Sequence, residues 1–103
     1  KKYDKALRYY QNSLKIKKEI GDSISIAATL QNIGNLYLAQ NHLSTAKKYF
    51  EEALKISAAK DLKKILRDSF LGLSEVYRMR KNFKPALAYF QKYATLKDSV
   101  MNE

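Results

Sequence analysis

The chain has 103 residues, 46% of them apolar, and a formal net charge of +10, which suits one basic domain with a core. Three glycines and one proline are too few for a turn-rich β architecture, and the plentiful Ala, Leu, Lys, Glu and Gln residues favour helix. The absence of cysteine excludes disulfides and thiolate sites, and no apolar run is long enough to cross a bilayer.

The spacing of the apolar residues predicts five helices. They cover approximately residues 4–20, 23–40, 43–59, 62–80 and 83–100. Gly21 is expected to end the first helix because glycine adopts positive φ without strain. Asp22 or Ser23 can cap the second helix, and Asp61 can cap the fourth. Pro85 falls in the first turn of the last helix, where its missing N–H costs nothing.

The sequence repeats with a period of 40 residues. The aligned positions keep the size of their side chains: Ala6, Ala46 and Ala86; Tyr9, Tyr49 and Tyr89; Tyr10, Phe50 and Phe90; Ile33 and Leu73; Gly34 and Ser74; Tyr37 and Tyr77. Interlocking helices need a small residue wherever a neighbouring helix inserts a large one. We therefore expect Gly34 to lie at a close helix–helix contact, facing an aromatic ring.

Short connections force neighbouring helices to pack antiparallel, and repeated hairpins stack instead of closing into a bundle. The predicted fold is all-α: an α-solenoid of antiparallel helical hairpins, with about five helices in a right-handed superhelical arc. We expect one domain over residues 1–103, with repeats at 3–20 (partial), 23–60 and 61–100. Because the chain opens on Lys1 and not Met, we expect a fragment of a larger protein.

The repeated positions resemble the tetratricopeptide family, whose repeats carry a large residue, Leu-Gly and Tyr on one helix and Ala and aromatic residues on the next. One full copy is formed by Leu30, Ile33, Gly34, Tyr37, Leu43, Ala46, Phe50, Ala53 and Leu54. A second copy is formed by Phe70, Leu73, Ser74, Tyr77, Phe83, Ala86 and Phe90, and Tyr3, Ala6, Tyr10 and Ser13 belong to a partial one. Ser74 replaces the glycine, and Tyr93 replaces the last alanine of the pattern.

The period of 40 residues exceeds the usual 34 of the family. It is similar to long-helix variants in scaffold, sensory and regulatory proteins. The segments 18–22 and 93–99 resemble repeat domains of bacterial sensor histidine kinases and related regulators. This resemblance implies a protein–protein or peptide-binding scaffold module, the sensory or interaction part of a signalling protein.

Nothing in the sequence carries a catalytic constellation. His42 is the only histidine and falls in a predicted turn, and Glu51 and Glu52 are adjacent on a helix, so their side chains diverge. There is no glycine-rich phosphate loop. We therefore expect no enzyme activity, no cofactor and no metal.

The resemblance implies that the first helix of each repeat lines a concave groove. The candidate groove residues are Ala28, Gln31, Asn32, Asn35 and Leu38 on one repeat, and Leu71, Glu75 and Arg78 on the next. Asn32 and Asn35 are three residues apart and share a helix face, and amides can hold a peptide backbone whatever its sequence. A solvated helix face is the alternative. The carboxylate clamp of some relatives is not expected, because Gln31, Asp68 and Gly72 replace its basic residues.

A protein or peptide is the expected partner. Nucleic-acid binding is the main alternative because of the basic charge and the aromatic pairs, such as Tyr49 and Phe50, but one aromatic of each pair is expected in the core. The basic residues are scattered, and residues 23–42 contain no charged side chain. A purely structural spacer is another alternative. Uncapped ends predict self-association through Leu7, Tyr10, Tyr93, Leu96 and Val100. The compartment stays open between cytoplasm and periplasm.

Overall fold

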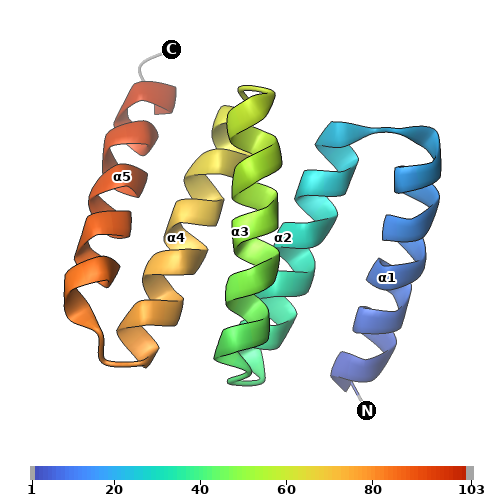
Figure 1. Cartoon of the computed structure of the whole chain (residues 1–103), viewed down its shortest axis with the longest axis horizontal. Helices are drawn as coiled ribbons and strands as arrows, with labels where there is room; N and C mark the ends of the chain where they lie inside the picture. The colour runs from blue at the N-terminus through green and yellow to red at the C-terminus, as the bar shows by residue number, and fades with distance from the viewer. Residues whose placement is uncertain (1, 102–103) are drawn as a thin grey trace.

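The computed structural model describes residues 2–101, which form five α-helices and no strand. The helices are α1 (Lys2–Ile20), α2 (Ser23–Ala39), α3 (Leu43–Ala59), α4 (Lys63–Met79) and α5 (Phe83–Met101). Consecutive helices run antiparallel and pack side by side from one end of the molecule to the other (Figure 1). The predicted all-α solenoid of helical hairpins is therefore confirmed.

The chain reverses direction in the same way at every connection. The residues with positive φ are Gly21 (82°), Asn41 (62°), Asp61 (54°) and Lys81 (60°), which recur at intervals of 20. After each of them, the next N–H donates to the carbonyl five residues earlier, as in His42 to Tyr37 (2.9 Å) and Asn82 to Tyr77 (2.9 Å). This is the Schellman arrangement, which satisfies carbonyl groups that a helix end leaves free.

Two capping predictions have different outcomes. Asp22 caps α2 as expected, since its carboxylate accepts from the backbone N–H of Ser25 at 3.2 Å and from the Ser25 hydroxyl at 2.6 Å. The predicted cap at Asp61 is wrong, because Asp61 occupies the left-handed turn position and Leu62 precedes α4 without a side-chain cap. The Schellman turn needs its left-handed residue one position before the N-cap, and that requirement decides the role of Asp61.

The core is centred on Phe50 of α3, whose side chain is fully buried. It forms one buried cluster with Ala46 of α3 and with Leu73 and Val76 of α4, and Leu30 and Ile33 of α2 are buried as well. Full burial of a side chain of this size contributes about 1.5–3 kcal/mol each. Phe50 also lies between two helices, α2 and α4, that contact each other directly.

Two glycines make room for the Phe50 ring. A Cβ atom on Gly34 would lie 2.9 Å from Phe50 Cε1, and one on Gly72 would lie 2.5 Å from the same atom. The expectation that Gly34 meets an aromatic ring is confirmed. Gly72, which the sequence places at a position of the carboxylate clamp, is buried, because the preceding repeat inserts Phe50 against it.

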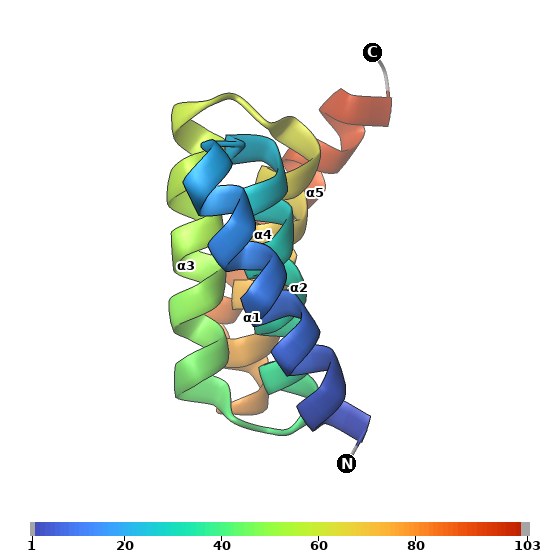
Figure 2. The ribbon, with the colours of Figure 1, turned by 90° about the vertical axis from the view of Figure 1, so that its right-hand side faces the viewer.

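The third copy of this aromatic position behaves differently. Phe90 aligns with Phe50 but is 46% exposed, because no described helix lies on that face of α5. In the last pair, Tyr89 and not Phe90 is the aromatic residue that packs against the core. Seen along the row of helices, α1 and α5 are tilted at different angles (Figure 2), so the array twists.

The sequence predicts self-association through apolar residues at the two uncapped ends of the array. Of these residues, Leu7, Tyr10, Tyr93 and Leu96 are half-buried, and the Val100 side chain lies outside the described part.

Candidate functional site

A groove runs between α2 and α4, the first helices of the two full repeats. It encloses about 340 Å³ and is lined by Gln31, Asn32, Asn35, Leu38, Asp68, Leu71, Gly72 and Glu75. The two helices lie close enough to share a groove because Gly34 of α2 and Gly72 of α4 have no side chain and both pack directly against the Phe50 ring. The same packing that builds the core therefore positions this surface.

Six of the eight candidate residues taken from the sequence line this groove. Ala28 is half-buried on α2 but does not reach the groove. Arg78 is exposed and borders a different hollow together with Phe83, Leu87 and Phe90. The sequence pattern placed Ala28 one turn too early and Arg78 one turn too late, because α2 and α4 meet over only part of their length.

The amide side chains of the groove are available to a ligand. Asn32 and Asn35 are exposed and Gln31 is half-buried. Within residues 2–101, no hydrogen bond ties any of these three amides to another part of the protein. Each amide can both donate and accept, so together they present a row of unused hydrogen-bonding groups.

The acidic residues of the groove are neutralised by arginines of the same helix. The Asp68 carboxylate accepts from Arg67 Nε at 2.8 Å and Nη2 at 3.2 Å, and the Glu75 carboxylate accepts from Arg78 Nε at 2.5 Å. The side-chain hydrogen bond from Arg67 to Asp68 raises the pKa of the guanidinium above its usual range. The groove therefore offers paired charges and not a net negative field.

Comparison with models of known families identifies the same helical-hairpin repeat. A family model described as tetratricopeptide repeat matches residues 1–59, more than half of the chain. The chain belongs to the tetratricopeptide-repeat family. A search of curated proteins found no match. Repeats of this family generally mediate protein–protein interaction and act as non-catalytic scaffolds.

The second full copy, residues 61–100, lies outside the matched segment. Its geometry nevertheless reproduces the first copy of the tetratricopeptide repeat. Tyr37 stacks on Tyr49 with ring centres 5.7 Å apart, and Tyr77 stacks on Tyr89 at 5.8 Å. Burial, followed by the neighbouring tyrosine, raises the pKa of both Tyr49 and Tyr89. Equal stacks at equal positions show that both hairpins use one packing scheme.

The carboxylate clamp known from some tetratricopeptide domains does not fit this groove. Asp68 and Gly72 line the wall where basic groups would be needed, and Gln31 faces them from α2. A free carboxylate entering here would meet the oxygens of Asp68 and Glu75 without an unpaired cation beside them. The groove therefore suits a neutral peptide backbone better than a C-terminal carboxylate.

Two other kinds of feature are absent from the described residues. Among residues 2–101, no three His, Cys, Asp or Glu side chains converge in a way that could hold a metal ion. No helix of the described chain has the length and hydropathy needed to cross a bilayer.

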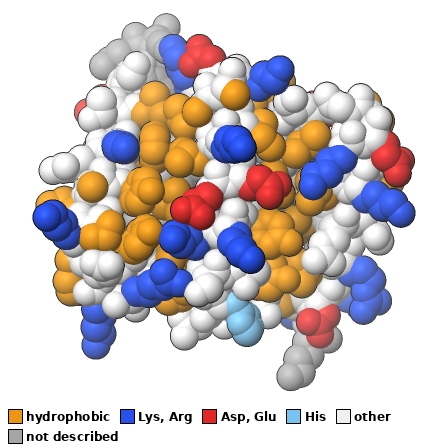
Figure 3. Space-filling view, viewed as in Figure 1, with side chains coloured by type: hydrophobic (Ala, Val, Ile, Leu, Met, Phe, Trp, Pro, Cys, Tyr) orange, Lys and Arg blue, Asp and Glu red, His pale blue; other side chains and the backbone are white. Residues whose placement is uncertain are grey.

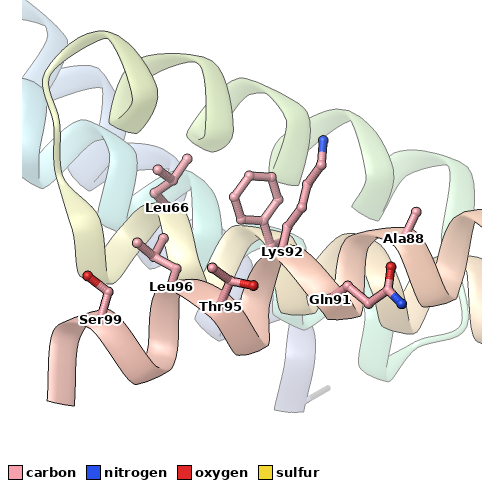
Figure 4. A pocket seen from close by; sticks show the side chains of 8 residues that line it. Leu66, Ala88, Gln91, Lys92, Thr95, Leu96 and Ser99 are labelled. Atoms are coloured by element: carbon pink, nitrogen blue, oxygen red, sulfur yellow. The ribbon is translucent and has the colours of Figure 1, made fainter. Parts of the chain in front are cut away.

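Sequence reasoning missed a second hollow, between α4 and α5. It encloses about 600 Å³, its surface is mostly apolar, and Figure 4 shows its lining side chains. On this side of the domain, hydrophobic side chains form bands on both flanks of α3 (Figure 3). The available signal was the composition of α5, which has uncharged residues at several positions where α3 has charged ones.

Proposed function

We propose that the domain binds an extended segment of a partner protein in the α2–α4 groove. One observation carries the proposal: side chains from two helices 40 residues apart converge on one hollow that contains three amides without internal partners. Unpaired amides on an exposed face favour a ligand that brings its own donors and acceptors. A peptide backbone does so at every residue.

The chemistry of the groove sets what such a segment should contain. Each amide hydrogen bond contributes about 0.5–1.5 kcal/mol net, so useful affinity needs several of them. Leu38 and Leu71 add apolar contacts at the two walls. Glu75 and Arg78 form an exposed ion pair that can exchange partners with charged side chains of the ligand, which would make the pair a selector of ligand sequence.

The experiment starts from a partner captured on the immobilised domain. Its affinity is then measured for the wild type and for the double variant Asn32→Ala, Asn35→Ala by isothermal titration. We expect at least a roughly tenfold loss, since two hydrogen bonds are removed. Both side chains are exposed, so the fold should be unaffected, which circular dichroism checks.

Two controls make the result decisive. Asn12→Ala removes an exposed amide on α1, outside the groove, and should leave the affinity unchanged. Charge reversal of Lys47 and Lys48 tests the α3 surface. If the double amide variant keeps full affinity while the lysine reversal abolishes binding, the groove is the wrong surface.

We also propose that the domain is the interaction part of a bacterial signalling protein. The support is the resemblance of segments 18–22 and 93–99 to repeats attached to sensor kinases. The coding sequence that flanks this segment provides the test. A membrane span followed by a kinase core would support the proposal, and an unrelated neighbouring domain would contradict it.

A further inference from the structure

A hollow of about 600 Å³ lies between α4 and α5 and is distinct from the α2–α4 groove. We call it the α4–α5 groove. It is lined by Leu66, Phe70, Ala88, Gln91, Lys92, Thr95, Leu96 and Ser99 (Figure 4). Leu66, Phe70 and Leu96 form its half-buried apolar floor, and the residues of α5 form an exposed wall.

A hollow at this place is a property of the repeat. The preceding repeat has an equivalent one of about 370 Å³, lined by Leu14, Lys18, Leu30, Thr45, Lys48, Tyr49 and Glu52. Leu30, Lys48 and Glu52 align with Phe70, Ala88 and Lys92 across the period of 40 residues. The earlier hollow also takes Leu14 and Lys18 from α1, so the two hollows coincide at these three positions.

The two hollows differ in the charges on their walls. Three charged residues, Lys18, Lys48 and Glu52, line the earlier hollow, and only Lys92 lines the α4–α5 groove. Along the helix, the charged Lys48, Glu51 and Lys55 of α3 correspond to the uncharged Ala88, Gln91 and Thr95 of α5. All three α5 residues are exposed, at positions where charged side chains would normally keep a helix solvated. The α4–α5 groove also has the larger volume, about 600 Å³ against about 370 Å³ for the earlier hollow. Loss of charge together with gain of volume is typical of a surface that excludes water on binding.

Lys92 carries the only charge among the residues that line the α4–α5 groove. Its Nζ lies 5.7 Å from the centre of the Phe70 ring and 5.8 Å from that of Tyr89, in cation–π contact. Ion pairs of the described residues do not include Lys92, and Glu51 of α3 is paired with Lys47 at 3.9 Å. Lys92 is therefore free to meet a carboxylate of a ligand.

We propose that the α4–α5 groove docks an acidic amphipathic helix of a partner protein, with its apolar face over Phe70 and Leu96 and a carboxylate against Lys92. The groove follows α5 from Ala88 to Ser99, which at the helical rise is about 17 Å, or three turns. The small side chains of Ala88, Thr95 and Ser99 let a second helix approach closely. A helix with anchors one turn apart fits such a groove. This proposal does not depend on the function of the α2–α4 groove.

The test uses a fluorescein-labelled peptide of about 14 residues, with leucine and alanine on one helical face and glutamate on the other. Fluorescence anisotropy measures its affinity for the wild type and for the variant A88K/Q91E/T95K. This variant gives α5 the charges that α3 already carries. We expect it to weaken binding about tenfold or more, since the new charges would have to be buried beneath the peptide.

A matched control and a charge swap complete the design. K48A/K55T makes the opposite exchange on α3 and should leave the affinity unchanged. K92E should weaken the glutamate peptide and strengthen a peptide in which lysine replaces glutamate. Circular dichroism of each variant confirms that it is folded.

Three results would overturn the proposal. The first is an A88K/Q91E/T95K variant that binds as the wild type does. The second is loss of peptide binding in the Asn32→Ala, Asn35→Ala variant, which would assign the peptide to the α2–α4 groove. The third is displacement of a bound dye from the groove by dodecanoate but not by the peptide, which would indicate a fatty-acid site.

Discussion

The Phe50 ring lies so close to Gly72 that a Cβ atom there would come within 2.5 Å of Cε1. The corresponding distance at Gly34 is 2.9 Å. The same ring thus meets a glycine of its own repeat and a glycine of the next repeat. Because the closer contact joins different repeats, Gly72 controls how the hairpins stack.

Gly72→Ala should destabilise the domain by about 1–2 kcal/mol, since the overpacking exceeds the gain in helix propensity. Gly34→Ala should change the free energy of unfolding by less, because the ring needs to move only a few tenths of an ångström. Gly34→Leu should lower the melting temperature clearly. Urea unfolding measures all three, and equal effects of the two alanine variants would contradict this account.

Lys81 adopts a φ of 60°, which costs an L-residue with a Cβ atom about 1–2 kcal/mol. Lys81→Gly should therefore stabilise the domain by about 0.5–1 kcal/mol after the larger entropy of the unfolded chain is subtracted. The matched reverse change is Gly21→Ala, at a φ of 82° with no atom within 4 Å of the added Cβ. It should be destabilising through backbone strain alone. Thermal unfolding of both variants checks the opposite signs.

Asp22 should make stability depend on pH. The hydrogen bond from the Ser25 side chain, then that from the Ser25 backbone, lowers the pKa of Asp22 below its ordinary value of 3.8. A lowered folded-state pKa stabilises the fold above the unfolded-state pKa, and this contribution is lost as pH falls through the folded-state pKa. Asp22→Asn should keep a cap but flatten the acid side of the profile of melting temperature against pH. An unchanged profile would contradict the assignment.

Two buried serines of α4 should respond differently to alanine. Ser74 donates to the Ala86 carbonyl at 2.8 Å, so Ser74→Ala removes a buried hydrogen bond between α4 and α5 and should cost about 1 kcal/mol. The Ser69 hydroxyl is buried without a hydrogen-bond partner in the described chain. Ser69→Ala should therefore be neutral or stabilising. Denaturant unfolding of the pair measures this difference, and a destabilised Ser69→Ala variant would count against it.

The net charge of +10 should give only weak, salt-sensitive affinity for nucleic acid. The central aromatic pair is not available to stack on bases, since Phe50 is buried and Tyr49 stacks on Tyr37. Anisotropy with random-sequence DNA should show binding that disappears as salt is raised to the physiological range. Submicromolar, sequence-selective binding at that salt would overturn this prediction.

Much of the fold was determined by the sequence alone. The spacing of apolar residues and the repeated sizes at Ala46, Phe50 and Gly34 predicted five helices, their order and the close contact at Gly34. These properties could be predicted because helix formation and hairpin turns depend on residues a few positions apart. The six groove residues of α2 and α4 follow from the same periodicity, since each helix shows one face to its neighbour.

Other properties were decided only by contacts between distant residues. Asp61 is a turn residue and not a cap. All four chain reversals have the Schellman geometry, which requires a left-handed residue at the position that Asp61 occupies. Gly72 is buried because Phe50, 22 residues earlier in the chain, packs against it. The apolar α4–α5 groove forms where two helices lie side by side, and no single helix shows it. Burial is a property of pairs of helices, so only the tertiary structure decides which apolar residues form the core and which form an open surface.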